Sequence, residues 1–396
     1  MEAYVLDWLS LLLRWAHLVV GIAWIGASLY FIWLDNSLAD PERAEDRERG
    51  VAGELWAVHG GGFYHAQKYR LAPPALPERL HWFKWEAYWT WITGFALLVL
   101  LYYVNAETYL IDPSVAALSK PQAVGIGLAS LVAGLALYEG LCRSPLGRND
   151  AALAAVLLAI LAAIAWGLSL VFSGRGAYMH YGAILGTIMV GNVAHVIIPG
   201  QRELVRAKQE NREPDPKHAL AGKQRSVHNT YFTLPVLFVM ISGHYAMTFG
   251  SRWKWLVLVA LTVAGALIRV WFVMRHKGAA PAWPLAAGIL ILAAVAVVLA
   301  PRGGVGEASA VKFAEVRRIL DLRCVSCHAA KPTFPGLAEA PRGLALDSAE
   351  RIRAMAPSIR QQTVLTKVMP PGNVTGMTAE ERALLDRWIL GGARTD

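Results

Sequence analysis

The chain is poor in cysteine and in charged residues. It has three cysteines in 396 residues, and 17% of its residues are charged while 55% are hydrophobic. With a mean hydropathy of +0.38, this balance excludes an ordinary soluble enzyme and is typical of a polytopic membrane protein. Cys324 and Cys327 form a spaced pair, whereas Cys142 ends an apolar run, where it is expected to be a small buried side chain.

Acidic residues are fewer than basic ones, which gives a net charge of +9. Because the lysines and arginines lie in short loops between apolar runs, they are expected to set membrane orientation, and no nucleic-acid partner is predicted. The first residues, "MEAYVLDWLS", have no basic segment and continue into an apolar run too long for a cleaved signal. The first segment is therefore predicted to be a retained anchor.

The long apolar runs predict an all-α protein with a polytopic bundle of about eight membrane spans, since about 20 apolar residues cross about 30 Å of hydrocarbon. The expected spans are 5–34, 85–104, 122–142, 151–173, 178–199, 229–249, 254–274 and 283–300.

Loop charges predict the orientation of these spans. The loops after spans one, three, five and seven hold most of the arginines and lysines, and the alternate loops hold few. By the positive-inside rule, both termini lie outside the cytoplasm, in the periplasm or its equivalent. After the linker "APRGGVGEASA" the composition becomes that of a soluble domain. We expect a membrane domain over 1–304 and a periplasmic domain over 305–396.

The motif "CVSCH" is the strongest chemical signal in the chain. Two thiols spaced as Cys324 and Cys327 can add across the vinyl groups of a haem, while His328 ligates its iron. A redox dithiol or half a zinc site would need a βαβ context or a second ligand pair, and no Cys or His follows residue 328. The motif predicts one covalent haem c on the oxidising, exported side, which agrees with the topology.

The sixth ligand of that iron is expected to be a methionine. Met369, in "KVMPPGNVTGM", leads because prolines stiffen its loop, and Met377 and Met355 are its rivals. An amphipathic helix in "VKFAEVRRILDLR" and a second in "TAEERALLDRWILGG", with a capping box of Thr378 and Glu381, predict the two packed terminal helices of a class I-like cytochrome c.

Several ionisable residues lie inside the expected spans, where their cost makes them functional candidates. The histidines are either haem or metal ligands or side chains satisfied by hydrogen bonds, and their candidates are His17, His180, His195 and His244. Electrons from a cytoplasmic substrate would need a relay to a periplasmic haem, and the simplest is one or two b-type haems held by histidines. Glu139 and Arg269 serve proton handling and anion binding, or form a mutual ion pair.

The expected cytoplasmic segment "GELWAVHGGGFYHAQKY" combines histidine, glycine, aromatic and basic residues. Its glycines permit close approach of backbone to a ligand, and a planar anionic ring would suit stacking on Tyr64, the charge of Lys68, and proton transfer by His59 or His65. The alternative is an interfacial segment whose aromatic residues form a membrane belt.

Together these segments resemble the membrane-anchored bacterial urate hydroxylases, also called urate oxidases, which join an eight-span domain to a C-terminal cytochrome c. The resemblance rests on "RWAHLVVGIAWIGASLYFIWLDN", "ELWAVHGGGFYHAQKY", "WFKWEAYWTWITG" and the tail from "CVSCH" to "MPPGNVTGMT". It implies oxidation of urate to 5-hydroxyisourate in purine catabolism. The electrons would pass through a haem c to a soluble cytochrome c or a terminal oxidase. The resemblance assigns the covalent attachment of this haem to Cys324 and Cys327, and its iron ligands to His328 and Met369.

Two other classes fit parts of the sequence. One is a quinol-linked electron-transfer cytochrome without urate chemistry, and the other is a metal or small-molecule transporter. Both leave "HGGGFYH" without a role, and transport also leaves the cytochrome without a purpose.

Overall fold

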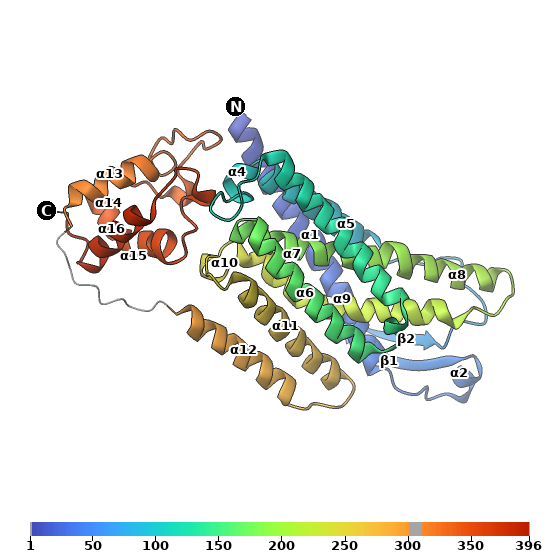
Figure 1. Cartoon of the computed structure of the whole chain (residues 1–396). Coiled ribbons are helices and arrows are strands. Elements are labelled where there is room, and N and C mark those ends of the chain that lie inside the picture. The colour runs from blue at the N-terminus through green and yellow to red at the C-terminus, as the bar shows by residue number, and fades with distance from the viewer. Residues whose placement is uncertain (1, 301–310, 396) are drawn as a thin grey trace.

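The computed structural model describes residues 2–300 and 311–395, and it is mostly helical (Figure 1). The expected domain boundary at 304/305 lies outside the described residues. We call residues 2–300 the bundle and residues 311–395 the C-terminal unit.

The bundle contains twelve α-helices, two strands and three short helices of 3-10 or π type, among the residues described. They are α1 (Glu2–Ser37), α2 (Ala44–Glu48), β1 (Val51–His59), β2 (Gly62–Tyr69), α3 (Trp85–Leu98), η1 (Val99–Tyr103), α4 (Ala106–Tyr109), α5 (Lys120–Arg143), η2 (Pro145–Arg148), α6 (Asp150–Val171), α7 (Gly174–Asn192), η3 (Val193–Ile197), α8 (Ile198–Gln209), α9 (Pro216–Ser242), α10 (Ala246–Phe249), α11 (Lys254–His276) and α12 (Trp283–Leu299).

Five helices of the described chain are long and apolar enough to cross a membrane. These are Tyr4–Ser37, Lys120–Arg143, Asp150–Val171, Gly174–Gln209 and Lys254–His276, and α12 is a shorter apolar helix. Large apolar side chains such as Leu12, Trp15 and Ile22 are exposed along α1, as lipid contact requires. The other two expected spans are helical but interrupted, at η1 and between α9 and α10. The count of eight stays a prediction.

The prediction of an all-α chain is wrong at residues 51–69, which form an antiparallel hairpin of β1 and β2. Gly60 and Gly61 connect the strands with φ values of 58° and 81°. A two-residue turn with both φ values positive matches the twist of a hairpin, and glycine adopts it without steric cost. The glycines that were read as space for a ligand are therefore turn residues.

The core of the bundle lies around α7, which contacts α3, α5, α6 and α9. Tyr178, Tyr181, Ile184 and Leu185 of α7 are almost fully buried in it. Because α7 is covered on all sides, its polar residues must find partners inside the protein. Asn192 of α7, for example, bonds Asn229 of α9, and Tyr181 bonds Thr262 of α11.

The C-terminal unit has its own hydrophobic core. Its helices are α13 (Phe313–Arg323), η4 (Pro341–Gly343), α14 (Ala349–Ala354), α15 (Ala356–Ile359), η5 (Arg360–Leu365), η6 (Pro371–Asn373) and α16 (Ala379–Leu390). Val316 and Leu320 of α13 pack with Leu385 and Trp388 of α16. The predicted capping box of Thr378 and Glu381 is confirmed, and so are the two terminal helices.

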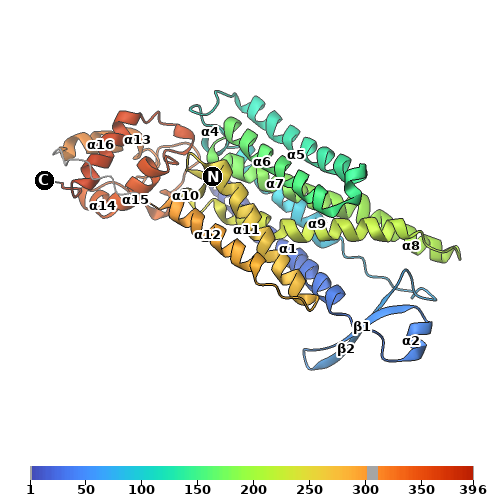
Figure 2. The same cartoon turned by 60° about the horizontal axis from the view of Figure 1, so that its bottom comes forward.

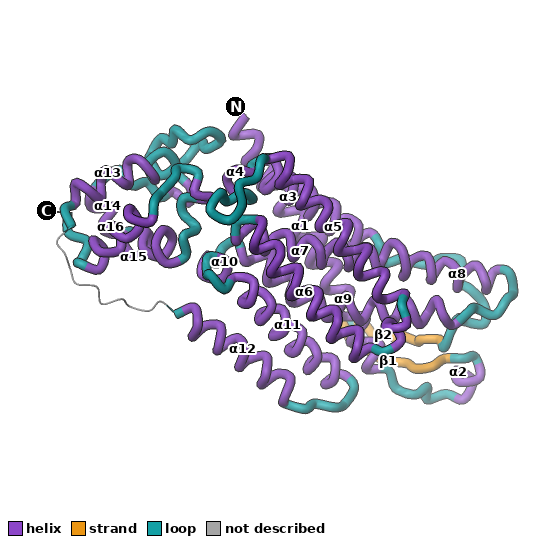
Figure 3. Tube along the Cα trace, viewed as in Figure 1, coloured by secondary structure: helices purple, strands orange, loops and turns teal. Residues whose placement is uncertain are grey.

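The long helices run between two ends of the molecule (Figures 1 and 3). The N-terminus, α4, α10 and the C-terminal unit lie at one end, which we call the tail end. The hairpin, α8 and the start of α9 lie at the other, the hairpin end, and a second view gives the same arrangement (Figure 2). Both described termini of the bundle, residues 2 and 300, lead toward the tail end, as an even number of crossings requires.

Candidate functional site

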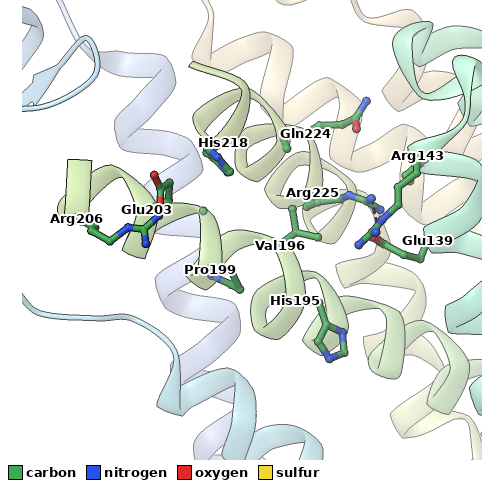
Figure 4. A pocket seen from close by; sticks show the side chains of 13 residues that line it. Glu139, Arg143, His195, Val196, Pro199, Glu203, Arg206, His218, Gln224 and Arg225 are labelled. Carbon is green, nitrogen blue, oxygen red and sulfur yellow. Dashed lines mark hydrogen bonds and ion pairs between the residues drawn. The ribbon is translucent and has the colours of Figure 1, made fainter. Parts of the chain in front are cut away.

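A pocket with a cavity volume of 640 Å³ opens at the hairpin end (Figure 4). It is lined by Glu139, Cys142, Arg143, His195, Val196, Pro199, Gly200, Glu203, Arg206, His218, Ala221, Gln224 and Arg225. These residues come from α5, η3, α8 and α9, so three separate parts of the chain build it. Its size is within the usual range for small-molecule sites.

Arg225 is the buried cation of this pocket, with a side chain 5% exposed. Its Nη2 donates to Glu139 Oε2 at 2.9 Å, and its guanidinium lies 5.0 Å from the centre of the Tyr138 ring. Glu139 also accepts from Arg143 Nε at 2.6 Å. Arg225 Nη1 is buried and has no hydrogen-bond partner among the described residues. A buried N–H donor without a partner is costly, which indicates that a ligand or water supplies the acceptor.

A chain of polar side chains lies behind Arg225. Asn192 donates through Nδ2 to the Tyr138 hydroxyl at 3.0 Å and to Asn229 Oδ1 at 2.8 Å. The same hydroxyl lies 2.7 Å from His228 Nδ1. Asn192 Oδ1 is a buried acceptor without a partner in the described chain. The pocket therefore has an unused donor on Arg225, and the polar chain behind it has an unused acceptor on Asn192, which is outside the described lining of the pocket.

Local backbone geometry explains how His195 reaches the pocket. Pro199 has no N–H, and its ring would clash with the carbonyl of His195 in a regular α-helix. The chain instead makes the π-helical turn η3 between α7 and α8. Such turns are frequent at functional sites because they rotate side chains out of register. His195 is exposed here and lines the pocket beside Val196.

The hairpin residues do not share this pocket. His65 Nε2 lies 2.8 Å from Glu54 Oε2, and its ring stacks on Trp56 with centroids 4.1 Å apart. The backbone N–H of Glu42 donates to Glu54 and holds the pKa of its carboxyl below the ordinary value; Gln67 and His65 act in the same direction, while burial opposes them. The hairpin is thus tied to the preceding loop by a satisfied carboxylate.

The other predicted hairpin residues are exposed. His59 and Tyr64 face outward near the turn. Lys68 pairs with Asp35 at the end of α1, which also lies 3.8 Å from Lys223 of α9. Burial, and then the charge of Lys223, lower the pKa of Lys68. The structure therefore gives Lys68 a role in joining the hairpin to α1 and does not bring it to the pocket.

The four candidate membrane histidines lie apart in different surroundings. His17 Nδ1 lies 3.0 Å from Thr93 Oγ1, and that hydroxyl donates to the Trp89 carbonyl oxygen at 2.7 Å. His180 is fully buried, with Nδ1 2.9 Å from the Gly176 carbonyl and Nε2 3.2 Å from the Tyr103 hydroxyl.

These contacts favour a hydrogen-bonded core histidine for His180, since both nitrogens are used. His195 and His244 are exposed. Within the described ranges no group of three or more His, Cys, Asp and Glu side chains could hold a metal ion. The prediction that these histidines hold b-type haems remains untested.

The suggested ion pair of Glu139 with Arg269 is wrong, because Glu139 pairs with Arg143 and Arg225. Arg269 is 5% exposed on α11, and its Nε and Nη2 have no partner in residues 2–300 and 311–395. The sequence placed both residues near the cytoplasmic ends of their spans, which is at a similar depth in the membrane. Depth does not show which side of the helix a residue is on. Only the helix packing shows that Glu139 faces α9.

The arrangement of the "CVSCH" residues fits a covalent haem. Both cysteines are free thiols just after α13. Burial, and then the neighbouring Cys327, raise the pKa of the Cys324 thiol to about 12, so this thiol is neutral at physiological pH. His328 Nδ1 lies 3.0 Å from the Leu344 carbonyl oxygen and donates to it, which orients the ring and leaves Nε2 free for a metal.

The three candidate methionines differ in their surroundings. Met377 is 3% exposed in the core of the C-terminal unit, and Met355 packs against that core. Met369 is half-buried in the loop after η5, outside that cluster. A thioether that fills the core is not free to ligate iron, so these contacts favour Met369 over its rivals.

Sequence reasoning did not identify Arg225, His218 or His228 as site residues. Arg225 and His228 are three residues apart at the start of an apolar run, a spacing that puts them on one face of a helix. That spacing was the available signal. Their partners on α5, Glu139 and Tyr138, are 86 and 90 residues away, which no local pattern reveals.

The fold and the pocket define a mostly helical protein with apolar helices of membrane-crossing length and a small-molecule pocket at one end. The family model described as urate oxidase N-terminal matches residues 3–300. The chain belongs to this family, which indicates a urate-related oxidoreductase. No curated protein and no solved structure matches the chain.

Proposed function

We propose that the protein oxidises urate to 5-hydroxyisourate in the pocket around Arg225. The observation that carries this proposal is the buried guanidinium whose Nη1 has no partner in the described chain. In the reaction urate and one water give 5-hydroxyisourate, two electrons and two protons. The site must therefore bind an anion, accept protons and let electrons leave.

The pocket has residues suited to the first two tasks. Arg225 supplies a donor for a urate oxygen, and Glu139 holds its guanidinium in place. His195 and His218 line the pocket and are the candidates for taking up protons.

We further propose that the C-terminal unit is a cytochrome c with one covalent haem. Cys324 and Cys327 would bind it, and His328 and Met369 would ligate its iron. A haem with His and Met ligands supplies one-electron acceptance at a high potential. The chain's own contribution is the Leu344 carbonyl, which fixes the tautomer of His328.

The proposed location is a bacterial inner membrane, with the tail end in the periplasm and the hairpin end in the cytoplasm. A soluble cytochrome c or a terminal oxidase would take the electrons onward. Two arguments support this location: the basic residues are concentrated in the loops assigned to the cytoplasm, and c-type haem is attached in an oxidising, exported compartment.

The test is an anaerobic optical spectrum of the oxidised protein before and after urate is added. The c-type α-band should appear with urate in the parent protein and in Arg212→Gln, a surface arginine of the loop after α8. Arg225→Gln should show the band with dithionite but not with urate. A band that appears only with quinol or dithionite in the parent would overturn the urate assignment and favour a quinol-linked cytochrome.

A further inference from the structure

One loop of the C-terminal unit makes close contact with the bundle. Residues 366–373 carry Met369 and reach the tail end, where η6 packs against α4. A Cβ built on Gly372 would lie 2.6 Å from the carbonyl oxygen of Ile111 and 2.8 Å from that of Glu107. The two backbones therefore touch with no room for a side chain between them.

The other side of Met369 is held by the bundle as well. A Cβ built on Gly250, just after α10, would lie 2.5 Å from both Cβ and the carbonyl oxygen of Thr366. Val368 packs against the buried core of the bundle. The residues before and after Met369 thus both contact the bundle, and they do so at two different elements.

The loop is fixed from within the C-terminal unit by Arg382. This guanidinium is 8% exposed; its Nη1 donates to the carbonyl oxygens of Met369, at 2.7 Å, and of Thr363, and its Nη2 to Asn373 Oδ1 at 3.2 Å. One buried side chain therefore binds the loop at two points and joins it to η5 at a third. A loop held in this way keeps its shape when it docks.

We propose that the loop 366–373 is the face through which the C-terminal unit receives electrons from the bundle, and that Arg382 is the positioning residue for Met369. This inference rests on the proposed haem. A bound haem would accept one electron at a time, so two transfers would follow each urate. Direct backbone contact beside the ligand methionine shortens the path by excluding a layer of water.

The docking is tested by cross-linking Ser251→Cys to Lys367→Cys with a short bifunctional thiol reagent, because these residues follow the touching pair Gly250 and Thr366. This pair should cross-link, and the control pair Gly222→Cys with Lys367→Cys should not, because Gly222 lies near the start of α9 at the hairpin end (Figure 1). A mobility shift on a gel reports the cross-link without any need for haem or urate. Absence of the cross-link in the first pair would overturn the docked arrangement.

The cross-linked protein then tests the electron path. We expect urate to reduce its haem within about twofold of the parent rate, since the docked geometry is the productive one. Loss of urate-driven reduction, with the dithionite-reduced band unchanged, would overturn the inference. If urate also fails to reduce the haem of the parent, the proposed function fails instead, and the cross-linking result still stands.

The role of Arg382 has its own readout. Arg382→Gln should lose the ferric methionine–iron charge-transfer band and lower the reduction potential, because methionine ligation raises it. Arg382→Lys keeps one donor and should retain part of the band. A full band and an unchanged potential in Arg382→Gln would show that Met369 does not depend on Arg382.

Discussion

The hairpin and the pocket contain the same kinds of side chain, but they use them differently. Each has a carboxylate, a histidine and an aromatic ring close together. In the hairpin, Glu54 and His65 bind each other, and the histidine stacks on Trp56. In the pocket, Glu139 binds only part of Arg225, and one guanidinium nitrogen has no partner in the described structure.

The difference shows how a structural cluster can be told from a binding site. Hydrogen bonds are complete around Glu54, so nothing is left to recognise a ligand. Around Arg225 and Asn192 a donor and an acceptor are buried and unused. Because such groups are rare in folded proteins, they point to the pocket more strongly than residue type alone does.

Glu139→Gln should have the largest effect, because it leaves Arg225 as an uncompensated buried charge. We expect a loss of about 3–5 kcal/mol in the free energy of unfolding, as for other broken buried ion pairs, together with loss of urate binding. Thermal unfolding in detergent and urate titration measure the two effects. Unchanged stability would mean that Arg225 is not buried as described.

Tyr138→Phe should have a smaller effect at the same site. It removes the hydroxyl that accepts from Asn192 and contacts His228, so Asn192 is left buried with one hydrogen bond fewer. An unsatisfied buried group costs about 1–3 kcal/mol, so we expect the free energy of unfolding to fall by about this amount. Thermal unfolding in detergent provides the measurement, and an unchanged stability would show that the Asn192 contact is absent in solution.

Gly61→Val should affect the hairpin and leave the pocket unchanged. Gly61 has φ 81°, and a β-branched residue held there costs about 1–3 kcal/mol in local stability. Proteolysis at residues 59–62 should become faster. Urate oxidation should stay within about twofold of the parent, since the described lining of the pocket comes from other elements. A loss of activity comparable to that of Arg225→Gln would show that the hairpin takes part in urate oxidation.

Acidification gives the smallest expected change. The pKa of Glu54 is below its ordinary value of 4.5, so its contribution to stability is present above that value and is lost as pH falls through the lower folded pKa. Fluorescence of Trp56, which stacks on His65, should therefore report no transition of Glu54 centred at the ordinary value of 4.5, and the transition should come only at lower pH. A transition of Glu54 centred at 4.5 would show that the Glu42 contact is absent in solution.

The positions of the helices were largely predictable, because an apolar run of about 20 residues has few alternatives to a buried or membrane helix. The capping box of Thr378 and the two terminal helices of the C-terminal unit followed from local pattern in the same way. The hairpin was missed because "HGGG" was read as room for a ligand, whereas Gly60 and Gly61 have the positive φ values of a turn.

The pocket was only partly predictable. Glu139 was identified from its depth in a span, but the one partner suggested for it, as an alternative to proton handling, was on α11 instead of α9. Which helices are neighbours, and how each is rotated, depends on packing over the whole bundle. Arg225 could be recognised as a site residue only after that packing was known.

The separation of the pocket from the C-terminal unit has a consequence for cellular energy. Helix α5 extends from the tail end to the pocket over 24 residues, about 36 Å, which exceeds a hydrocarbon core of about 30 Å. On the proposed function, each electron leaves a negative compartment and crosses the membrane voltage, which is worth about 2.3 kcal/mol per charge at 100 mV. Urate oxidation would thus be drawn forward by the membrane potential and would partly discharge it.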